Sequence, residues 1–238
     1  MAQFQRGDVS IYYEVHGGGF PFLLIAPGGM RSTVGFWDRM AFNPIKEFAG
    51  EYQVIAMDQR NAGQSTGPLG EGWRSYAEDQ AALLEHLGVD RFHVMGGCIG
   101  CSYALGLIER TGNRCAAAVL QNPIGLQDNR DVFYGMVREW AKELRDKRPE
   151  IAERETEALT QNMFSGEFVF TVDAAFVKAC RTPMLVLPGD DNFHPTATAR
   201  EIAALAPDAE CLELGWREPD TVGGTVERIR SFLKQHTP

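Results

Sequence analysis

The stretch from Arg91 to Cys101 constrains the fold more than any other part of the sequence. Its first half carries the apolar residues of a strand, and the residues after Cys101 predict a helix. Gly96 and Gly100 stand two residues before and two residues after Cys98, where a Cβ would collide within a sharp turn. This spacing is typical of the strand–turn–helix elbow that presents a reactive side chain.

Such a turn would place Cys98 at the first N–H groups of the following helix. The positive end of a helix favours a thiolate over a neutral thiol. The alternative is a glycine-rich turn with a buried, inert cysteine, because cysteine is among the most buried residue types. The remaining sequence has to decide between these two interpretations.

The composition favours a soluble, single-domain protein. The 238 residues carry a net charge of −9, which argues against nucleic acid or an anionic membrane as the main partner. The N-terminus lacks an apolar signal region, and no run reaches the ~18 apolar residues of a membrane span. The five cysteines form no disulfide or zinc pattern. We therefore expect a cytoplasmic protein without a metal or cofactor.

Short apolar runs alternate with amphipathic stretches along the chain. Strands are expected at 10–16, 22–26, 52–57, 91–95, 115–120, 183–187 and 210–214, and helices at 73–87, 102–110, 131–145, 149–162, 196–205 and 222–235. Helical spacing also occurs around residues 36–42, and residues 168–170 are ambiguous. This alternation predicts a mostly parallel sheet with helices on both faces.

Four loops of unusual composition follow predicted strands. They are Pro27–Met30, Asp58–Ser65, Gly96–Gly100 and Gly189–Pro195. Ligands of parallel sheets bind outside the carboxyl ends of the strands. The sequence therefore predicts a site where these loops meet.

Taken together and in this order, the motifs resemble those of the α/β-hydrolase superfamily. They are Pro27-Gly-Gly, Asp58-x-Arg60-x-x-Gly63-x-Ser65, the elbow at Cys98, an insertion after the sixth strand, and the Gly-Asp-Asp loop. The resemblance spans nearly the whole chain and implies an eight-stranded, mostly parallel sheet. It also implies a hydrolase core, residues 1–123 and 181–238, and a small helical cap, residues 124–180.

The elbow suggests a nucleophilic mechanism. Cys98 would attack an acyl carbonyl and form a thioester. The oxyanion that develops needs preorganised donors. The N–H of Ile99 is expected to supply one, and an N–H of Gly29 or Met30 the other.

The acid is expected in the loop Gly189–Pro195. The family has Gly, then Asp three residues later, then Pro four residues after that Asp. Here Asn192 stands three residues after the glycine, whereas Asp191 stands four residues before the proline. Asp191 is therefore the expected acid and Asp190 the second candidate, while the other of the pair would cap a helix or turn the loop.

The sequence departs from the family at the catalytic histidine. Trp216 stands where the late His is expected, and residues 196–235 contain no His. His194, on the acid loop, is the candidate base, and the alternative is that it packs locally before Pro195. A thiol tolerates a weaker base than a hydroxyl does, because it ionises near pH 8.5. The remaining histidines, His16, His86, His93 and His236, are expected away from the site.

Three functions remain open at this point. The first is a hydrolase or acyltransferase that acts on a small ester, thioester or lactone through a thioester on Cys98. The second is a different reaction on the same fold, such as carbon–carbon cleavage or decarboxylation. The third is a small-ligand-binding protein without catalysis.

The cap is expected to select the substrate. Apolar residues that predict a pocket roof are Phe133, Tyr134 and Trp140, with Met136, Met163, Phe164 and Phe168 beside them. The alternative is that most of them pack the cap on itself. The expected partner is a small-molecule substrate, and a homodimer is left open.

Overall fold

An eight-stranded sheet organises the chain, and its strand order is β1-β2-β4-β3-β5-β6-β7-β8. The computed structural model describes residues 2–238. The strands are β1 (Ala2–Arg6), β2 (Val9–His16), β3 (Phe20–Ile25), β4 (Tyr52–Met57), β5 (Phe92–Gly97), β6 (Cys115–Gln121), β7 (Met184–Leu187) and β8 (Ala209–Cys211). β1 and β2 pair antiparallel, as do β2 and β4, whereas every other pair is parallel. The predicted mostly parallel sheet is confirmed.

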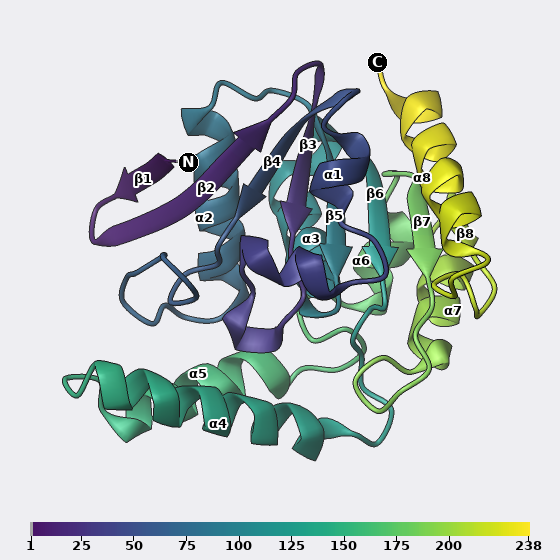
Figure 1. Cartoon of the computed structure of the whole chain (residues 1–238). Coiled ribbons are helices and arrows are strands. Elements are labelled where there is room, and N and C mark those ends of the chain that lie inside the picture. Colours follow the sequence, from purple (N-terminus) through teal and green to yellow (C-terminus); the bar gives the residue numbers. More distant parts are fainter. Residues whose placement is uncertain (1) are drawn as a thin grey trace.

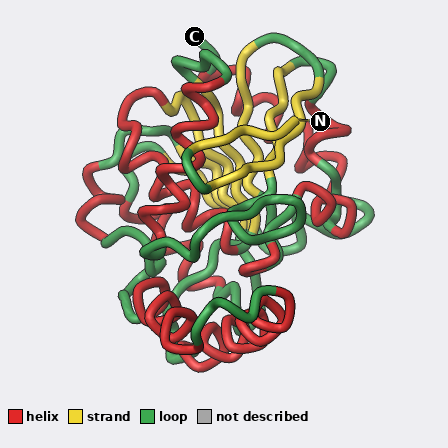
Figure 2. Tube along the Cα trace, turned by 90° about the vertical axis from the view of Figure 1, so that its left-hand side faces the viewer, coloured by secondary structure: helices red, strands yellow, loops and turns green. Residues whose placement is uncertain are grey.

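Helices cover both faces of this sheet (Figures 1 and 2). The α-helices are α1 (Pro44–Phe48), α2 (Trp73–His86), α3 (Ile99–Thr111), α4 (Arg130–Lys147), α5 (Glu153–Phe164), α6 (Ala174–Ala179), α7 (Thr196–Leu205) and α8 (Val222–His236). The 3₁₀ turns are η1 (Gly29–Arg31), η2 (Val34–Arg39) and η3 (Gly112–Arg114). The apolar residues of α2, α3 and α7 join one core, and those of α1 and α8 join the other.

Alternation along the strands divides the two cores. On β3, Leu23 and Ile25 pack toward α2 and α3, whereas Phe22 and Leu24 pack toward α1 and α8. All four side chains are fully buried. Because both faces are covered, the central strands are continuous apolar runs, which is the pattern that the sequence shows.

Several elements differ from the sequence-based expectation. β1 was not predicted, because its alternating polar residues give no apolar run; it forms as an edge strand paired to β2. β8 is shorter than the predicted 210–214. Residues 168–170 form no strand, since Phe168 and Phe170 have left-handed φ values of 54° and 67°. α6 was also not predicted.

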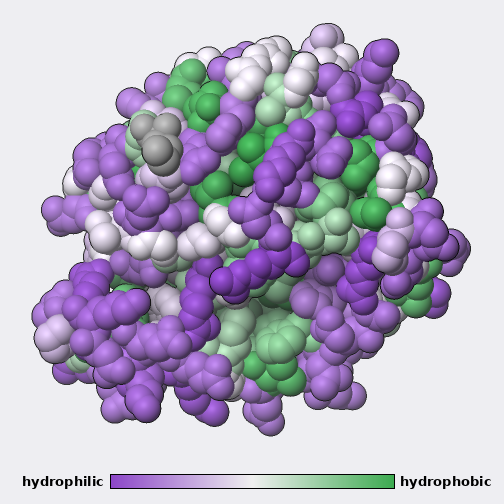
Figure 3. All heavy atoms as spheres, in the orientation of Figure 1, coloured by the Kyte–Doolittle hydropathy of each residue, from purple (hydrophilic) through white to green (hydrophobic). Residues whose placement is uncertain are grey.

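The helices α4 and α5 form a layer of their own below the sheet (Figure 1). The strand ends of β3, β5, β6 and β7 point toward this layer, so it lies over the predicted site edge. α6 instead contacts α7 beside the sheet, and the cap boundaries 124–180 stay a prediction. Hydrophilic side chains cover most of the face in Figure 3, with hydrophobic residues visible in the seam above the α4–α5 layer. None of the described helices is long and apolar enough to cross a membrane.

The Asp58–Ser65 loop is held by buried polar contacts. Arg60 Nε lies 2.7 Å from Asp79 Oδ2, and both side chains are almost fully buried. The Ser65 hydroxyl donates to the Asp58 carbonyl oxygen at 2.8 Å. A Cβ on Gly63 would lie 2.1 Å from Asp58 Oδ2. This motif therefore fixes the backbone beside the site rather than offering a reactive group.

Candidate active site

The expected strand–turn–helix around Cys98 is present between β5 and α3. A Cβ on Gly96 would lie 2.2 Å from the carbonyl oxygen of Gly100. A Cβ on Gly100 would lie 2.2 Å from the carbonyl oxygen of Ile25 at the end of β3. Because both collisions involve backbone atoms, only glycine fits at these two positions.

Cys98 has an unusual backbone conformation. Its φ of 55° and ψ of −120° lie outside the regions that L-residues favour. Such a residue costs about 1–3 kcal/mol and persists only where its surroundings hold it. Here the Cys98 N–H donates to the Gln121 carbonyl oxygen at 2.8 Å, and α3 begins at the next residue. Cys98 is partly exposed, which is the opposite of a buried, inert cysteine.

The replacement Gly100→Ala tests this close approach. We expect it to lower the free energy of unfolding by about 3 kcal/mol, because the added Cβ meets a backbone oxygen that cannot move aside. In a chain of this size that corresponds to a fall in Tm of about 6–12 °C. Gly35→Ala is the control, since nothing lies within 4 Å of its added Cβ. Equal Tm values for the two variants would contradict the tight elbow.

The loop after β3 lies beside the elbow. A Cβ on Gly100 would lie only 3.2 Å from the Ala26 carbonyl oxygen, so the start of α3 abuts the end of β3. Gly29 and Met30 open η1, and Ile99 opens α3. The first N–H groups of a helix have no intrahelical acceptor, and within residues 2–238 no backbone carbonyl accepts from these three. The three expected oxyanion donors therefore have no backbone acceptor in this part of the chain.

Asp191 supports its own loop and also binds an imidazole. Its Oδ1 accepts hydrogen bonds from the N–H of Phe193 at 2.8 Å and from the N–H of His194 at 3.1 Å. Burial raises the pKa of Asp191, but hydrogen bonding and charge attraction from His194 and these N–H groups lower it below the usual value. Asp190 instead pairs with Arg217. The geometry therefore favours Asp191 over Asp190 as the acid.

His194 lies between Asp191 and Cys98. Its Nδ1 is 2.8 Å and 2.9 Å from the two carboxylate oxygens of Asp191. Burial lowers the pKa of His194, but the neighbouring Cys98, and then the Asp191 carboxylate, outweigh it and raise the pKa to about 9. Nε2 is buried and has no well-formed hydrogen bond among the described residues, so it is the nitrogen left for Cys98.

The acid loop is closed by a glycine and by two hydrogen bonds. A Cβ on Gly189 would lie 2.3 Å from His194 Cβ, so the loop folds back on itself there. The Thr196 hydroxyl donates to the Gly189 carbonyl oxygen at 2.6 Å. Asn129, just before α4, donates from Nδ2 to the Asn192 carbonyl oxygen at 2.6 Å. Sequence reasoning missed Asn129, because an Asn before a helix indicates only an N-cap.

Trp216 is the residue expected from the sequence in place of the family's late histidine. Its side chain is buried, and Nε1 donates to the Pro188 carbonyl oxygen at 2.8 Å. It therefore packs against the residue that precedes the acid loop. The other histidines contact groups elsewhere: His16 pairs with Glu14, His86 packs on Phe4, His93 hydrogen-bonds Thr237, and His236 packs on Phe232.

The predicted roof residues divide into two groups. Phe133 is buried, and its ring lies 5.6 Å from that of Phe193, edge to face, next to the acid loop. The Tyr134 hydroxyl lies 3.1 Å from Gln161 Oε1 on α5. Trp140 is buried along a groove of about 400 Å³ between α4 and the Asp58–Ser65 loop. Phe133 thus lies next to the acid loop, whereas Tyr134 contacts α5 and Trp140 lines the groove beside the Asp58–Ser65 loop.

Met136 approaches the loop after β3 from α4. A Cβ built on Gly29 would lie 2.3 Å from Met136 Sδ. Gly29 has a φ of 59°, which glycine adopts easily. The thioether therefore rests against the Gly29 backbone, which carries one of the candidate oxyanion donors.

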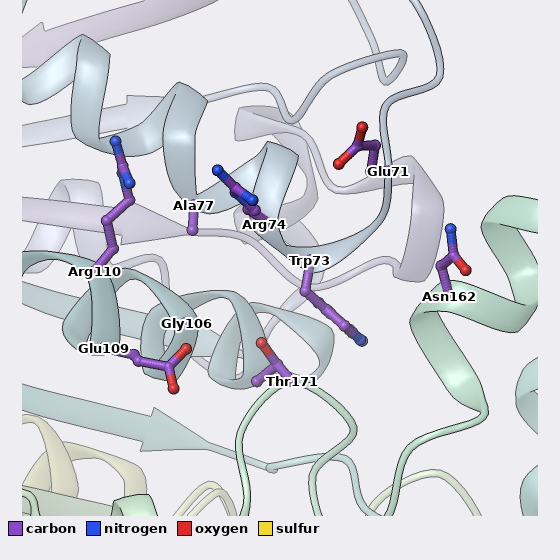
Figure 4. Close-up of a pocket in the computed structure, with 9 residues that line it drawn as sticks. All are labelled: Glu71, Trp73, Arg74, Ala77, Gly106, Glu109, Arg110, Asn162 and Thr171. Carbon is purple, nitrogen blue, oxygen red and sulfur yellow. The ribbon is translucent and has the colours of Figure 1, made fainter.

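A separate groove of about 460 Å³ lies between α2, α3 and α5 (Figure 4). Glu71, Arg74, Glu109 and Arg110 give it charges of both signs. None of its lining residues belongs to the four predicted site loops. Among residues 2–238, no group of three or more His, Cys, Asp or Glu is placed to hold a metal ion.

Comparison with known proteins points to one family. The family model described as "alpha/beta hydrolase fold" matches residues 21–178. A soluble epoxide hydrolase of a Corynebacterium species is 30% identical over 96% of this chain and 89% of its own length. A fluoroacetate dehalogenase of a Burkholderia species is 35% identical over 46% of this chain. This match spans 34% of the dehalogenase's own length. Three further relatives align with a stretch of similar length, and each of those matches spans under half of the relative's own length.

Solved structures agree on the fold. A structure described as an N-acyl homoserine lactone degrading enzyme superposes with a TM-score of 0.72. The two chains are 22% identical, and the match covers 97% of this chain and 100% of the other. At this identity the similarity establishes the shared architecture and nothing finer.

Proposed function

We propose that this chain, which belongs to the α/β-hydrolase fold family, hydrolyses a small ester, thioester or lactone through a thioester on Cys98. One observation carries the proposal: His194 binds Asp191 through Nδ1 and interacts with Cys98 on its other side. A nucleophile, a base and an orienting acid are therefore neighbours, which is what nucleophilic catalysis requires. A protein that only bound a ligand would not need this arrangement.

The first half-reaction forms the acyl-enzyme. The Cys98 sulfur attacks the carbonyl carbon, and the carbonyl oxygen takes the negative charge beside the N–H groups of Ile99 and Gly29 or Met30. When the tetrahedral intermediate collapses, the bond to the leaving oxygen or sulfur breaks. The His194 imidazolium gives that atom its proton, and the acyl group remains on Cys98.

The second half-reaction restores the enzyme. The neutral imidazole of His194 takes a proton from water, whose oxygen attacks the thioester. The carbon–sulfur bond breaks, the acid product leaves, and the thiolate and imidazolium form again. Asp191 holds the imidazole orientation throughout. An alcohol in place of water would give acyl transfer from the same intermediate.

Three sequence-based expectations remain proposals. They are the substrate-binding roles of Phe133, Tyr134 and Trp140, a cytoplasmic location, and a homodimer. All five cysteines are free thiols, which fits a reducing compartment. Carbon–carbon cleavage or decarboxylation on this fold has no observation in its favour, because the cysteine, histidine and aspartate suit acyl chemistry directly.

Selective alkylation tests the proposal. At pH 7 we expect iodoacetamide to modify Cys98 at least about tenfold faster than the other cysteines, since Cys98 is partly exposed and lies beside His194, a base that can take the thiol proton as the sulfur reacts. Loss of p-nitrophenyl acetate hydrolysis should follow that modification. Cys211 is the internal control, because it is also partly exposed. Preferential labelling of Cys211, with activity intact, would refute a Cys98 nucleophile.

Met136 is expected to restrict the acyl group. The replacement Met136→Ala removes the thioether from Gly29 and opens space next to the candidate oxyanion donor. The ratio of kcat/KM for p-nitrophenyl hexanoate to that for the acetate should rise about tenfold, a range typical of added methylenes in a pocket. Met40→Ala is the matched control, since Met40 is a partly buried methionine on the α1–α8 side. An unchanged ratio would place the acyl pocket elsewhere.

A further inference from the structure

Cys98 has a cysteine neighbour that the proposed mechanism does not use. Cys101 follows three residues later, so the first turn of α3 carries a C-x-x-C sequence. Cys98 is the N-cap of the helix and is partly exposed, whereas Cys101 lies in the first turn and is buried. An exposed thiol at a helix N-terminus with a buried thiol one turn later is the arrangement of a dithiol redox pair.

The backbone brings the two residues close together. The Cys101 N–H donates to the Cys98 carbonyl oxygen at 3.0 Å, which closes a tight turn. Residues at the ends of such a turn have Cα atoms within about 7 Å, and disulfides form at about 4.4–6.8 Å. The Gln121 carbonyl oxygen accepts from the Cys98 N–H at 2.8 Å and from the Cys101 thiol at 3.3 Å. The Cys98 backbone and the Cys101 sulfur therefore share one neighbouring atom at the end of β6.

The environments of the two sulfurs give them different roles. Cys98 lies beside the His194 imidazole and is partly exposed, so a small peroxide can reach it. Burial raises the pKa of Cys101, as does the neighbouring Cys98. Its thiol donates to the Gly96 and Gln121 carbonyl oxygens. Cys98 is thus the sulfur that a peroxide oxidises first, and Cys101 is the protonated thiol that can react with it afterwards.

We propose that Cys98 and Cys101 form a reversible disulfide when the protein meets a hydroperoxide. The Cys98 thiolate attacks the peroxide oxygen, the O–O bond breaks, and Cys98 becomes a sulfenic acid as the peroxide is reduced. The Cys101 sulfur then attacks the Cys98 sulfur, forms the S–S bond and displaces hydroxide, which takes the Cys101 proton and leaves as water. The two thiols lose two electrons in total, and hydrogen peroxide becomes two waters.

The disulfide would protect Cys98 from irreversible oxidation and would also stop its reaction with substrate. A sulfenic acid without a partner thiol goes on to sulfinic and sulfonic acids, which are irreversible in the absence of a dedicated repair enzyme. Closing the disulfide instead allows a dithiol to restore the thiol. The loss and return of hydrolysis rest on the proposed function, whereas formation of the disulfide does not.

Mass spectrometry of the peroxide-treated protein tests this proposal. The protein is exposed to hydrogen peroxide, quenched in acid, unfolded, alkylated with N-ethylmaleimide and cleaved with trypsin. Cleavage after Arg91 and Arg110 gives a single peptide that holds both cysteines. We expect this peptide to lose two hydrogens and carry no alkyl group, and dithiothreitol treatment before alkylation should restore two alkylation sites.

Matched variants separate the roles. In Cys101→Ser, whose hydroxyl can donate to the same carbonyls, Cys98 should proceed to sulfinic acid, and dithiothreitol should recover about tenfold less activity than in the wild type. Cys211→Ser should behave as the wild type. Peroxide treatment of the wild type that left sulfinic acid on Cys98 and an alkylated Cys101 would overturn the proposal. Because this mass spectrum is taken on the wild type, it decides the matter even if the Cys101 variant misfolds. A different pair of results would overturn the proposed function alone. In that case the wild-type protein forms the disulfide, while the Cys98→Ala variant still hydrolyses the ester at the wild-type rate.

Discussion

Replacement of Cys98 by alanine lowers kcat for a small activated ester by about 10⁴-fold or more, because the reaction loses its covalent route. The variant should keep its fold, since alanine removes one partly exposed sulfur and no hydrogen bond of the Cys98 backbone. The N–H donors remain in place, so substrate binding and a slow residual reaction should persist. Steady-state kinetics with p-nitrophenyl acetate, with circular dichroism as the check on folding, measure this loss.

Two further variants make the Cys98 result specific. Cys98→Ser keeps the shape of the elbow but replaces a thiol with a hydroxyl that ionises far less readily, so kcat should fall by about 10²-fold or more. Cys211→Ala should keep full activity, because β8 lies three strands from β5, or about 14 Å across the sheet. Turnover by Cys98→Ala at the wild-type rate would mean that another group carries the chemistry.

Replacement of His194 by glutamine lowers kcat by about 10³-fold, within the usual range for the loss of a general acid–base. Glutamine can still hydrogen-bond but cannot carry the proton between the leaving group and water. His86→Gln is the matched control, because His86 lies on α2, packed against Phe4, away from the site. A His194 variant with wild-type kcat would show that the histidine only packs within its loop.

The pH profile adds a readout that loop damage alone would not change. The pKa of His194 is raised to about 9, so the imidazolium is present at neutral pH and is lost as the pH rises through that value. Because the imidazolium supplies the proton to the leaving group, the wild-type rate should fall on the alkaline side near pH 9. The His194→Gln variant should lack this fall. An alkaline fall that persists in the variant would mean that another group titrates there.

The sequence predicted the parts of the site that depend on local chemistry. The glycines around Cys98 and the order of apolar runs fixed the elbow and the central strands, since each has a steric or packing cause within a few residues. The prediction of Asp191 over Asp190 came from comparison with the family's Gly-Asp-Pro spacing and stays a prediction. It agrees with the hydrogen bonds that Asp191 makes to the backbone and ring of His194.

The remaining features depend on contacts between distant segments. Whether His194 reaches Cys98 is decided by how a loop after β7 folds toward a turn after β5, which no local pattern records. Asn129 and Met136 act on loops that lie far from them in sequence. β1 gave no apolar signal, because an edge strand needs only one buried face. The sequence could only predict that Trp216 replaces a histidine, and its packing against Pro188 depends on the tertiary structure.

Trapping the acyl-enzyme tests the Cys98 nucleophile most directly. The protein is mixed with p-nitrophenyl acetate, quenched in acid within the first turnover, digested and analysed by mass spectrometry. We expect a burst of p-nitrophenolate and an acetyl group on Cys98, in the peptide that follows Arg91, with the other cysteines unmodified. Full turnover with an acetyl group on a different residue, or with none on Cys98 at any quench time, would contradict a thioester mechanism.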